Sequence, residues 1–576
     1  MTTLAANTSV TITLDGDDVL TTDGNATFQI TPTSGGKGEG YLTGHQTLGP
    51  YGQYVTIVLT SINNPITYSQ ASDVSESEIA RYGKDASGNI TSLVSRDGTI
   101  VPAAQLRSVL LVGDSITAYA ETVLSTTSVT NLGNGTANIQ RTSHSLVAGQ
   151  KTRIAAAADV ALNVLQATVI SVTDANNFVV SLDGPVHNVT GSSAVIAFPD
   201  RASTRGWPCW FELFAGEPLA RTFASVPGAR IRDIAALLAV MQSGSNDIAA
   251  ICLGMNNIYA GGATLATMQS EWTDLIVQIK RRSSRIVVLS VPPRDSADGS
   301  WSSGKQTVHT QWNRWLYDQC AENGWEFVDT WIASSGGATY VNGAATNPDP
   351  LAAMVHDSAH PSMRGAAAIG AAVWAKVSKW FGVQGWRAPH PAAIGADAGN
   401  LLTGSDFATD SAGVATNWLR TDVTASMNAT FTCAARTVAD DGDAAGRNQV
   451  LTINYGTATG TASCRFRRND IHALLTAGGI YVLSVPFRVT GATGLTGLEL
   501  VALGVAGGNT FFVQGQFQDS NTDPMIGDFA GRLITPAFVC PASLTDLDIW
   551  VRPYVTSAQS GDVVIKLWQP MLRRIA

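Results

Sequence analysis

The stretch Ser108-Val-Leu-Leu-Val-Gly-Asp-Ser115 decides the fold. It begins as an almost continuous apolar run, which is typical of a strand buried on both faces of a parallel sheet. Similar runs recur at 248–253, 285–291 and 326–328. Helix-like apolar periodicity extends over 230–241, 268–281, 312–323 and 363–380. Strands that alternate with helices predict a three-layer α/β/α core, in which a parallel sheet is covered on both faces.

The segments around this α/β region have a different, β-rich pattern, with short runs of period two between Gly, Asn, Asp and Thr turns. The last of them predicts a β-sandwich of the jelly-roll type. The predicted order is an N-terminal β domain (1–70), a connector (71–103), the α/β region (104–385) with an inserted small β module (122–203), a linker (386–399) and the C-terminal β-sandwich (400–576).

The composition excludes several classes of protein. Only 14% of the 576 residues are charged, against about 25% in average soluble proteins. With a net charge of −9 and no basic block, we expect no nucleic-acid partner and no attraction to anionic lipid. No apolar run is long enough for membrane insertion, and the first residues do not resemble a secretory signal, so we expect synthesis in a host cytoplasm. The six cysteines form no CxxC pair and are predicted to be free thiols.

Gly113-Asp114-Ser115 follows the first buried strand and precedes a predicted helix. A serine at this position is a candidate nucleophile, because unpaired backbone N–H groups at a helix start can stabilise an oxyanion. However, Asp or Ser in front of a helix is also a common N-cap. The motif alone leaves both interpretations open.

A second candidate motif, His356-Asp357-Ser358-Ala359-His360-Pro361, lies near the end of the α/β region. An Asp three residues before a His can fold back onto one ring nitrogen and leave the other for a nucleophile. An ordinary surface loop is one alternative, and a metal site made by His356 and His360 is another. The metal site is disfavoured because Pro361 would interrupt a helix that carried both histidines. We therefore expect neither a metal nor any other cofactor.

Two further segments can supply oxyanion donors. Asn256, in Gly254-Met-Asn-Asn257, follows a predicted parallel strand, at the edge where such sheets bind ligands. Gly228, in Ser225-Val-Pro-Gly228, precedes a predicted helix and offers its backbone N–H. Taken singly, the first is also compatible with an ordinary turn and the second with a helix start.

Together, the order Ser, Gly, Asn, Asp-x-x-His resembles the SGNH (GDSL-type) hydrolases over 104–122 and 203–385. The resemblance implies that Ser115 attacks an ester carbonyl, that His360 takes its proton and that Asp357 orients His360. It also implies an oxyanion hole made by Ser115, Gly228 and Asn256. In this family, the Asn that corresponds to Asn256 is normally followed by Asp, where this chain has Asn257. We expect activity to survive that change.

Two other residues are candidates for contact with substrate. Asp114 adjoins the candidate nucleophile, and Trp301 lies in the Gly- and Ser-rich segment 299–304. Aromatic faces stack on sugar rings, although large aromatic side chains more often belong to a core. We expect Trp301 to be the most exposed tryptophan of the α/β region.

The flanking modules also carry resemblances. In the inserted module, the segments 142–146, 149–154 and 172–178 resemble a small β module of bacteriophage virion proteins. The module is either a spacer or oligomer contact, or a wall of the substrate groove beside Ser115. Residues 400–576, which open with Asn400–Phe407 and include Trp418, resemble jelly-roll carbohydrate-binding modules, although a structural or trimer-forming cap is the other interpretation. As a whole, the chain resembles phage tailspike or tail-fibre carbohydrate esterases. That resemblance implies deacylation of a bacterial polysaccharide (O-antigen or capsule), a homotrimer, and a virion location beside phage tail or baseplate proteins.

Two alternatives remain at this point. One is a bacterial acetylxylan- or lipid-type esterase with appended binding modules. The other is a receptor-binding adhesin that has a hydrolase-like fold and no activity. The intact residues Ser115, Asn256 and His360 favour an enzyme over an adhesin.

Overall fold

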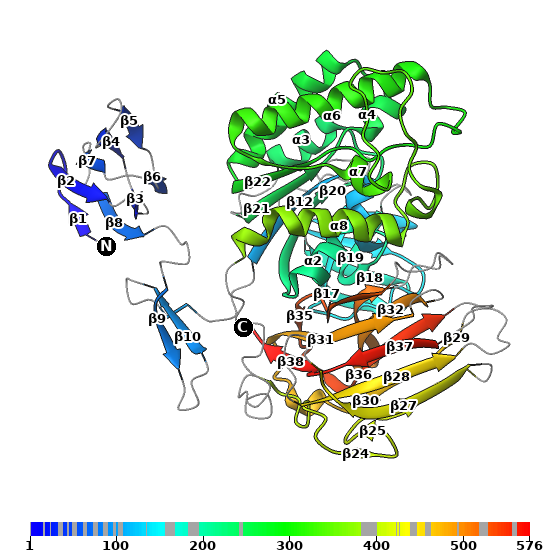
Figure 1. Ribbon diagram of the computed structural model, residues 1–576. Coiled ribbons are helices and arrows are strands. Elements are labelled where there is room, and N and C mark those ends of the chain that lie inside the picture. The colour runs from blue at the N-terminus through cyan, green and yellow to red at the C-terminus, as the bar shows by residue number, and fades with distance from the viewer. Residues whose placement is uncertain are drawn as a thin grey trace. The chain divides into compact units, whose positions relative to one another are not determined.

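The computed structural model divides into two compact units, Met1–Gln105 with Gly382–Gly385, and Leu106–Phe381 with Trp386–Ala576 (Figure 1). The residues that the structure describes are 2–14, 18–23, 25–32, 38–42, 45–48, 55–61, 66–72, 79–84, 90–95, 100–101, 107–133, 135–155, 167–181, 195–240, 246–381, 400–421, 423–424, 427–437, 446–454, 462–491, 495–517, 528–555 and 562–575.

The first unit begins with two four-stranded antiparallel sheets, as the period-two pattern of residues 1–70 predicts. Ile12, Leu20, Ile57 and Leu59 are among the buried side chains of their common core. The strands of one sheet, in spatial order, are β1 (Thr2–Leu4), β8 (Ile66–Ser72), β3 (Asp18–Asp23) and β6 (His45–Leu48). Those of the other are β2 (Ser9–Leu14), β7 (Val55–Ser61), β4 (Ala26–Pro32) and β5 (Gly38–Leu42).

Three short strands lie within the connector that the sequence predicts over 71–103. The strands β9 (Ile79–Lys84), β10 (Ile90–Ser95) and β11 (Ile100–Val101) form a small antiparallel sheet there. These strands are short and interrupted by Ser, Gly and charged residues, so their hydrophobic alternation is weak. The sheet is formed by pairing between strands that follow one another in the sequence, although no clear apolar pattern marks them.

The α/β region contains a five-stranded parallel sheet in the order β20–β12–β21–β22–β23. Four of its strands were predicted from their apolar runs. The fifth, β20, escaped prediction because Arg221 and Thr222 interrupt its apolar side chains, which an edge strand tolerates. The bounds are β12 (Arg107–Gly113), β20 (Leu219–Ser225), β21 (Asn246–Cys252), β22 (Ser283–Leu289) and β23 (Glu326–Val328).

Helices cover both faces of this sheet, which gives the predicted three layers (Figure 1). Alternate side chains of β12 point to opposite faces, so Leu110 and Val112 enter one core while Val109 and Leu111 enter the other. The first core is closed by α3 (Ile231–Val240), α5 (Leu265–Lys280) and α6 (Ser303–Asn323). The second is closed by α2 (Trp207–Ala215) and α8 (Met363–Val377).

The inserted module is a set of β-strands with a core of its own, which includes Val129, Ile139 and Phe178. Asp174–Asn177 forms the turn between two of its strands, where the backbone N–H of Asn176 donates to Asp174 Oδ1 at 2.7 Å. Its strands are β13 (Glu121–Ser125), β14 (Ser128–Gly133), β15 (Thr136–Gln140), β16 (Lys151–Ala155), β17 (Ala167–Asp174), β18 (Asn177–Ser181) and β19 (Val195–Ser203).

The C-terminal segment folds into two facing sheets with a large apolar core between them. One sheet consists mainly of β33 (Asn509–Phe517), β32 (Leu495–Ala506), β36 (Leu544–Val555), β30 (Arg465–Arg468) and β26 (Leu419–Thr421). The other consists mainly of β27 (Asn428–Ala435), β28 (Arg447–Asn454), β37 (Asp562–Leu567), β31 (Ile480–Thr490) and β34 (Phe529–Ile534). The linker predicted over 386–399 lies outside the described residues.

The sandwich is joined to the rest of its unit in two ways. Strand β19 of the insert pairs in parallel with β33, which makes one 13-stranded sheet out of insert and sandwich. Helix α2 also buries Trp210 and Leu213 in the sandwich core. A Cβ added to Gly531 would lie 2.4 Å from Leu213 Cδ2, so the helix and β34 are in close contact.

Replacing Leu213 tests this shared core. We expect Leu213→Ala to lower the free energy of unfolding by about 3 kcal/mol, because it removes buried methyl groups and leaves a cavity. Leu419→Ala is the matched control, since Leu419 is 45% exposed and its loss should cost less than about 0.5 kcal/mol. Chemical unfolding followed by circular dichroism measures both values, and equal effects would contradict the packing described.

Candidate active site

The site is built where three neighbouring parallel strands end at the same level. Gly113 at the end of β12 is paired with Ser225 of β20 on one side and Cys252 of β21 on the other. The residues after these strands therefore emerge at one carboxyl edge of the sheet, where open α/β sheets bind ligands. Those residues include Ser115, Gly228 and Asn256.

Ser115 is held by the tight strand-to-helix transition around it. It begins the short helix α1 (Ser115–Ala118), and Asp114 is the N-cap, which accepts a hydrogen bond from the Ile116 N–H at 3.1 Å. The motif therefore contains both an N-cap, which is Asp114, and the candidate nucleophile Ser115 next to it. A Cβ on Gly113 would lie 2.2 Å from Thr117 Oγ1, so only glycine fits before the turn.

Asp114 itself is only 1% exposed, and burial raises the pKa of its carboxyl group to about 7. A carboxyl group in this position is shielded from solvent. Its burial does not favour the contact with substrate that the sequence suggested, and it favours the capping role.

The loop before α8 brings Asp357 and His360 to Ser115. His360 Nδ1 lies 2.7 Å from Asp357 Oδ2, and His360 Nε2 lies 2.9 Å from Ser115 Oγ. The other Asp357 oxygen accepts the backbone N–H groups of Ala359 and His360 at 2.8 and 2.7 Å. The fold-back of an Asp onto a His three residues later is thus present as predicted.

The charge of Asp357 decides where the protons lie in the hydrogen-bonded series Ser115–His360–Asp357. Partial burial raises the pKa of its carboxyl group, but the N–H groups of His360 and Ala359 and the imidazole lower it more, to about 2. At neutral pH the carboxylate is therefore ionised and only accepts hydrogen bonds. It selects the tautomer in which Nδ1 carries the proton, so that Nε2 accepts from the Ser115 hydroxyl group.

Gly228 and Asn256, two of the three predicted oxyanion donors, follow the neighbouring strands β20 and β21. Gly228 has φ +80°, a left-handed conformation that favours glycine, in the turn between β20 and α3. Asn256 is in α4 (Met255–Tyr259), and its Nδ2 donates to the Ala229 carbonyl oxygen at 3.2 Å. The amide of Asn256 is therefore tied to the turn that carries Gly228.

Asn257 is the position at which the chain departs from the usual motif, and the structure gives a physical reason for an amide there. Its side chain is buried, its Oδ1 accepts from the Ile231 N–H at 2.9 Å, and its Nδ2 donates to Glu271 Oε2 at 2.6 Å. An aspartate could not donate to Glu271 and would face it with a like charge. Asn257 and Glu271 together fix the start of α3, next to Gly228.

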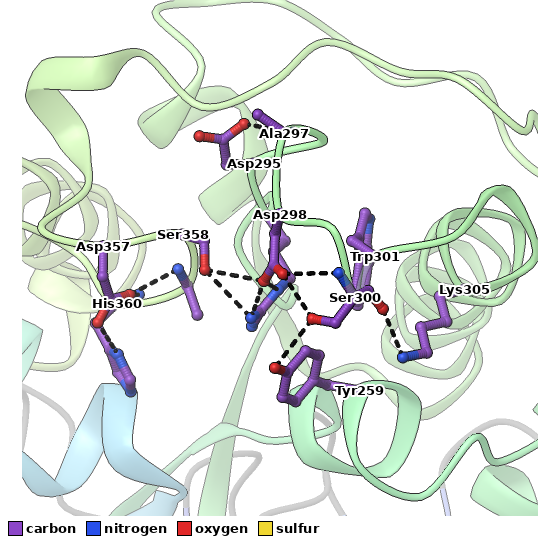
Figure 2. A network of polar contacts seen from close by, with 12 residues as sticks. Tyr259, Asp295, Ala297, Asp298, Ser300, Trp301, Lys305, Asp357, Ser358 and His360 are labelled. Atoms are coloured by element: carbon purple, nitrogen blue, oxygen red, sulfur yellow. Dashed lines mark hydrogen bonds and ion pairs between the residues drawn. The ribbon is translucent and has the colours of Figure 1, made fainter.

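A polar network supports the loop that carries Asp357 and His360 (Figure 2). Figure 2 shows the Asp298 carboxylate between Ser358 and Ser300, and Ser358 Oγ donates to it at 2.9 Å. Hydrogen bonds from Ser300, and then from Arg294 and Ser358, hold the pKa of Asp298 well below its usual range. The charged Asp298 thereby ties segment 294–300 to the residue that follows Asp357.

The prediction that Trp301 is exposed is wrong. Its side chain is 8% exposed, its Nε1 donates to Gln306 Oε1 at 2.6 Å, and the Arg294 guanidinium carbon lies 5.6 Å from its ring centroid. The surrounding Gly and Ser residues suggested a surface loop, but the indole packs into the core between the sheet and α6. Trp301 is thus a structural residue of this region.

Arg153 is a residue at this site that the sequence analysis missed. It comes from β16 of the insert, is 1% exposed, and binds Glu121 Oε2 through NH2 at 2.6 Å and through Nε at 3.1 Å. Its NH1 donates at 2.7 Å to the carbonyl oxygen of Ser225, three residues before Gly228. The sequence shows a charged residue within a short β-like run, between Thr152 and Ile154. Its role could not be predicted, because its partners Glu121 and Ser225 are far from it in sequence.

The six cysteines are all free thiols, as predicted. No group of three His, Cys, Asp or Glu side chains within the described ranges could hold a metal ion. No described helix combines the length and the apolar character of a membrane span.

Residues 189–368 match the GDSL-like Lipase/Acylhydrolase family. The match includes Gly228, Asn256, Asp357 and His360, which are the family-like positions on this edge of the sheet. Residues 189–368 are therefore a GDSL-like domain. Ser115 lies outside the matched span because the insert separates it in sequence, and the hydrogen bond to His360 joins it to the GDSL-like domain.

Similar solved structures share little sequence with this chain. A GDSL-family lipolytic protein from Veillonella parvula is 15% identical, with coverage of 30% of this chain and 86% of that one and a TM-score of 0.23. An acetyl-xylooligosaccharide esterase from Geobacillus Stearmophilus is 14% identical, with coverage of 47% and 93% and a TM-score of 0.26. The enzymatically active domain of tailspike protein 4 of bacteriophage CBA120 is 13% identical, with coverage of 30% and 22% and a TM-score of 0.19.

A β-sandwich carbohydrate-binding module is 9% identical, and the alignment spans 28% of this chain and 58% of that protein, with a TM-score of 0.19. No curated protein matches the chain.

Arg153 is expected to position the Gly228 turn of the GDSL-like domain. Arg153→Met leaves Glu121 buried without its partner, which should cost about 3–5 kcal/mol of stability. The double variant Glu121→Gln/Arg153→Met removes that charge, so we expect most of the stability to return. Its kcat should still be lower by about tenfold or more, with KM little changed, because the Ser225 carbonyl has lost its donor.

Steady-state hydrolysis of p-nitrophenyl acetate measures kcat and KM, and thermal unfolding measures stability. Lys151→Met is the matched control, because Lys151 lies on the same strand and, among the described residues, donates only to Thr168 Oγ1. A stable double variant with the kcat of the unchanged protein would show that Arg153 does not act on the site.

Proposed function

We propose that this protein is a carbohydrate esterase that removes acetyl or other acyl groups from a bacterial surface polysaccharide. The observation that carries the proposal is the relay of hydrogen bonds from Ser115 Oγ through the His360 imidazole to Asp357. Relays of this kind activate a serine hydroxyl group for attack on a carbonyl carbon. The GDSL-like domain supports acyl-ester hydrolysis as the reaction class.

In the first step, Ser115 Oγ attacks the acyl carbonyl carbon while its proton passes to His360 Nε2. Asp357 stays ionised and stabilises the imidazolium ion through Nδ1–H. The carbonyl oxygen becomes an oxyanion, which accepts hydrogen bonds from the N–H groups of Ser115 and Gly228 and from Asn256 Nδ2. Each such donor typically contributes a factor of about 10²–10³ in rate.

The tetrahedral intermediate then expels the sugar oxygen, which takes the proton from His360 Nε2 and leaves as a hydroxyl group. The acyl group remains on Ser115 Oγ. A water molecule attacks this ester in turn, gives one proton to His360, and releases the carboxylic acid as the Ser115–Oγ bond to the acyl carbon breaks. The proton on Nε2 returns to Ser115.

The choice of a polysaccharide rests on the surface and the modules. With 14% charged residues and 55 glycines, the chain offers a polar, weakly charged surface that suits hydroxyl-rich substrates. The resemblance of the insert to phage virion modules and the β-rich first unit support a place in a phage tail, as a homotrimer beside tail or baseplate proteins. The contact between α2 and the sandwich supports a role of the sandwich in holding a polymer near the GDSL-like domain.

Two other assignments predict different outcomes. A non-catalytic adhesin would bind a polysaccharide and release nothing from it. A bacterial acetylxylan- or lipid-type esterase would prefer acetylated xylan or long-chain esters over bacterial surface polymers. Acetate release from purified O-acetylated O-antigen or capsule, followed by the loss of acetyl methyl signals in NMR spectra, separates the three.

Ser115→Ala should abolish this activity while the protein remains folded. Removal of the nucleophile of a Ser–His–Asp relay typically lowers kcat by a factor on the order of 10⁴–10⁶. Hydrolysis of p-nitrophenyl acetate and acetate release from the polysaccharide are both expected to fall to background. Ser303→Ala, a change of an exposed serine at the start of α6, is the matched control and should leave both activities intact. Retained turnover by Ser115→Ala would refute the assignment.

A further inference from the structure

A cavity of about 410 Å³ lies on the 13-stranded sheet, on the face directed away from the sandwich core. Val551 and Ile549 of β36 point into that core, so Trp550, Arg552 and Tyr554, which alternate with them, point to the opposite face and line the cavity. Volumes of roughly 300–1,000 Å³ are typical of small-ligand sites.

The strand register gathers the lining residues from five strands, β19, β30, β32, β33 and β36. Glu499 of β32 is paired with Arg552 of β36, and Gln514 of β33 is paired with Arg201 of β19. The cavity therefore spans the seam at which the insert joins the sandwich. None of its lining residues belongs to the Ser115 site.

Three arginines of the cavity are each stacked on an aromatic ring. The guanidinium carbon lies 4.9 Å from the ring centroid for Arg201 over Phe512, 4.5 Å for Arg465 over Trp550, and 4.6 Å for Arg552 over Tyr554. Stacking fixes the plane of a guanidinium group, while its N–H donors lie along the edge of that plane. Pre-oriented donors of this kind suit the two oxygens of a carboxylate.

Glu499 adds a fixed acceptor among these donors. It is 2% exposed, it accepts from Tyr554 Oη at 2.8 Å and from Gln514 Nε2 at 2.6 Å, and burial raises the pKa of its carboxyl group. Arg552 NH1 lies 4.0 Å from Glu499 Oε1. Three guanidinium groups and a single carboxyl group thus line the cavity, which is cationic although the chain carries a net charge of −9.

Trp550 contributes an additional donor. The indole is 4% exposed, and its Nε1 has no hydrogen-bond partner among the residues described. A buried N–H group without a partner costs free energy, so a ligand oxygen that accepts from it would be stabilising. The cavity therefore combines cationic donors, a neutral donor and a carboxyl acceptor.

We propose that this cavity binds a carboxylate-bearing sugar residue of an acidic polysaccharide. Arg552 donates through Nε and NH2 to Ser463 Oγ, and its NH1 faces Glu499, so its role is to hold the wall of the cavity. Arg201 and Arg465 would bind the sugar carboxylate, while Glu499 and Gln514 would bind its hydroxyl groups. A simple anion would need donors only, so the buried acceptor Glu499 favours a ligand that carries hydroxyl groups as well as a charge. The inference does not depend on esterase activity, since the cavity and the Ser115 site share no residue.

Isothermal titration of the full-length protein with tri-galacturonic acid as the probe tests the proposal. We expect saturable binding that Arg465→Met and Arg201→Met each weaken by about tenfold or more, since a hydrogen bond to a charged group is lost. Arg420→Met is the matched control, because Arg420 lies on β26 of the same sheet but stacks on Phe431, outside the cavity. It should bind as the unchanged protein does.

Further titrations distinguish an acidic sugar from a neutral sugar and from free anions. The neutral counterpart galactotriose should bind at least tenfold more weakly, and acetate or inorganic phosphate at equal ionic strength should not compete at concentrations near the Kd of the acidic sugar. Equal binding of the neutral sugar, competition by the free anions, or no effect of either cavity variant would overturn the proposal. A change of oligomeric state in those variants would also overturn it, because it would assign the cavity to a contact between copies of the chain.

Circular dichroism and thermal unfolding establish that the variants are folded. Their hydrolysis of p-nitrophenyl acetate should remain unchanged, since the cavity residues lie outside the Ser115 site. Failure of sugar binding with intact esterase activity would refute this inference alone, whereas loss of esterase activity in Ser115→Ala bears only on the function proposed above.

Discussion

The whole site depends on the parallel pairing of β12 with β20 and β21. This pairing sets Gly113 level with Ser225 and Cys252, and the loops that follow supply Ser115, Gly228 and Asn256 at one edge. The register is fixed because β12 is buried on both faces. A slip of one residue would exchange the side chains that enter its two apolar cores, which is unfavourable for residues as tightly packed as Leu110 and Leu111.

The insert contacts this edge, and the sandwich packs against other parts of the same unit. Arg153 carries a contact from the insert to the Ser225 carbonyl, and Asn257 carries one from α4 to the start of α3. Elsewhere in the unit, β19 pairs in parallel with β33, and α2 contributes to the sandwich core. The turn that holds Gly228 is therefore fixed from two directions, which is the condition for preorganised oxyanion donors.

Local sequence patterns predicted the parts of the molecule that local chemistry determines. Ser115, Asp357 and His360 lie in short motifs, and the apolar runs of β12, β21, β22 and β23 are continuous. What escaped prediction depends on distant partners. Arg153 is informative only beside Glu121 and Ser225, and Trp301 looks exposed until Gln306 and Arg294 are placed around it. The sheet of β9–β11 has strands too short and too polar to show a clear alternation.

The central claim is that Ser115 is a nucleophile activated by His360. The most direct measurement is mass spectrometry of the protein after incubation with a fluorophosphonate, which phosphonylates only activated serine hydroxyl groups. We expect one adduct per chain, on the peptide that contains Ser115, and strongly reduced labelling in His360→Ala. No adduct, or an adduct on another serine, would contradict it.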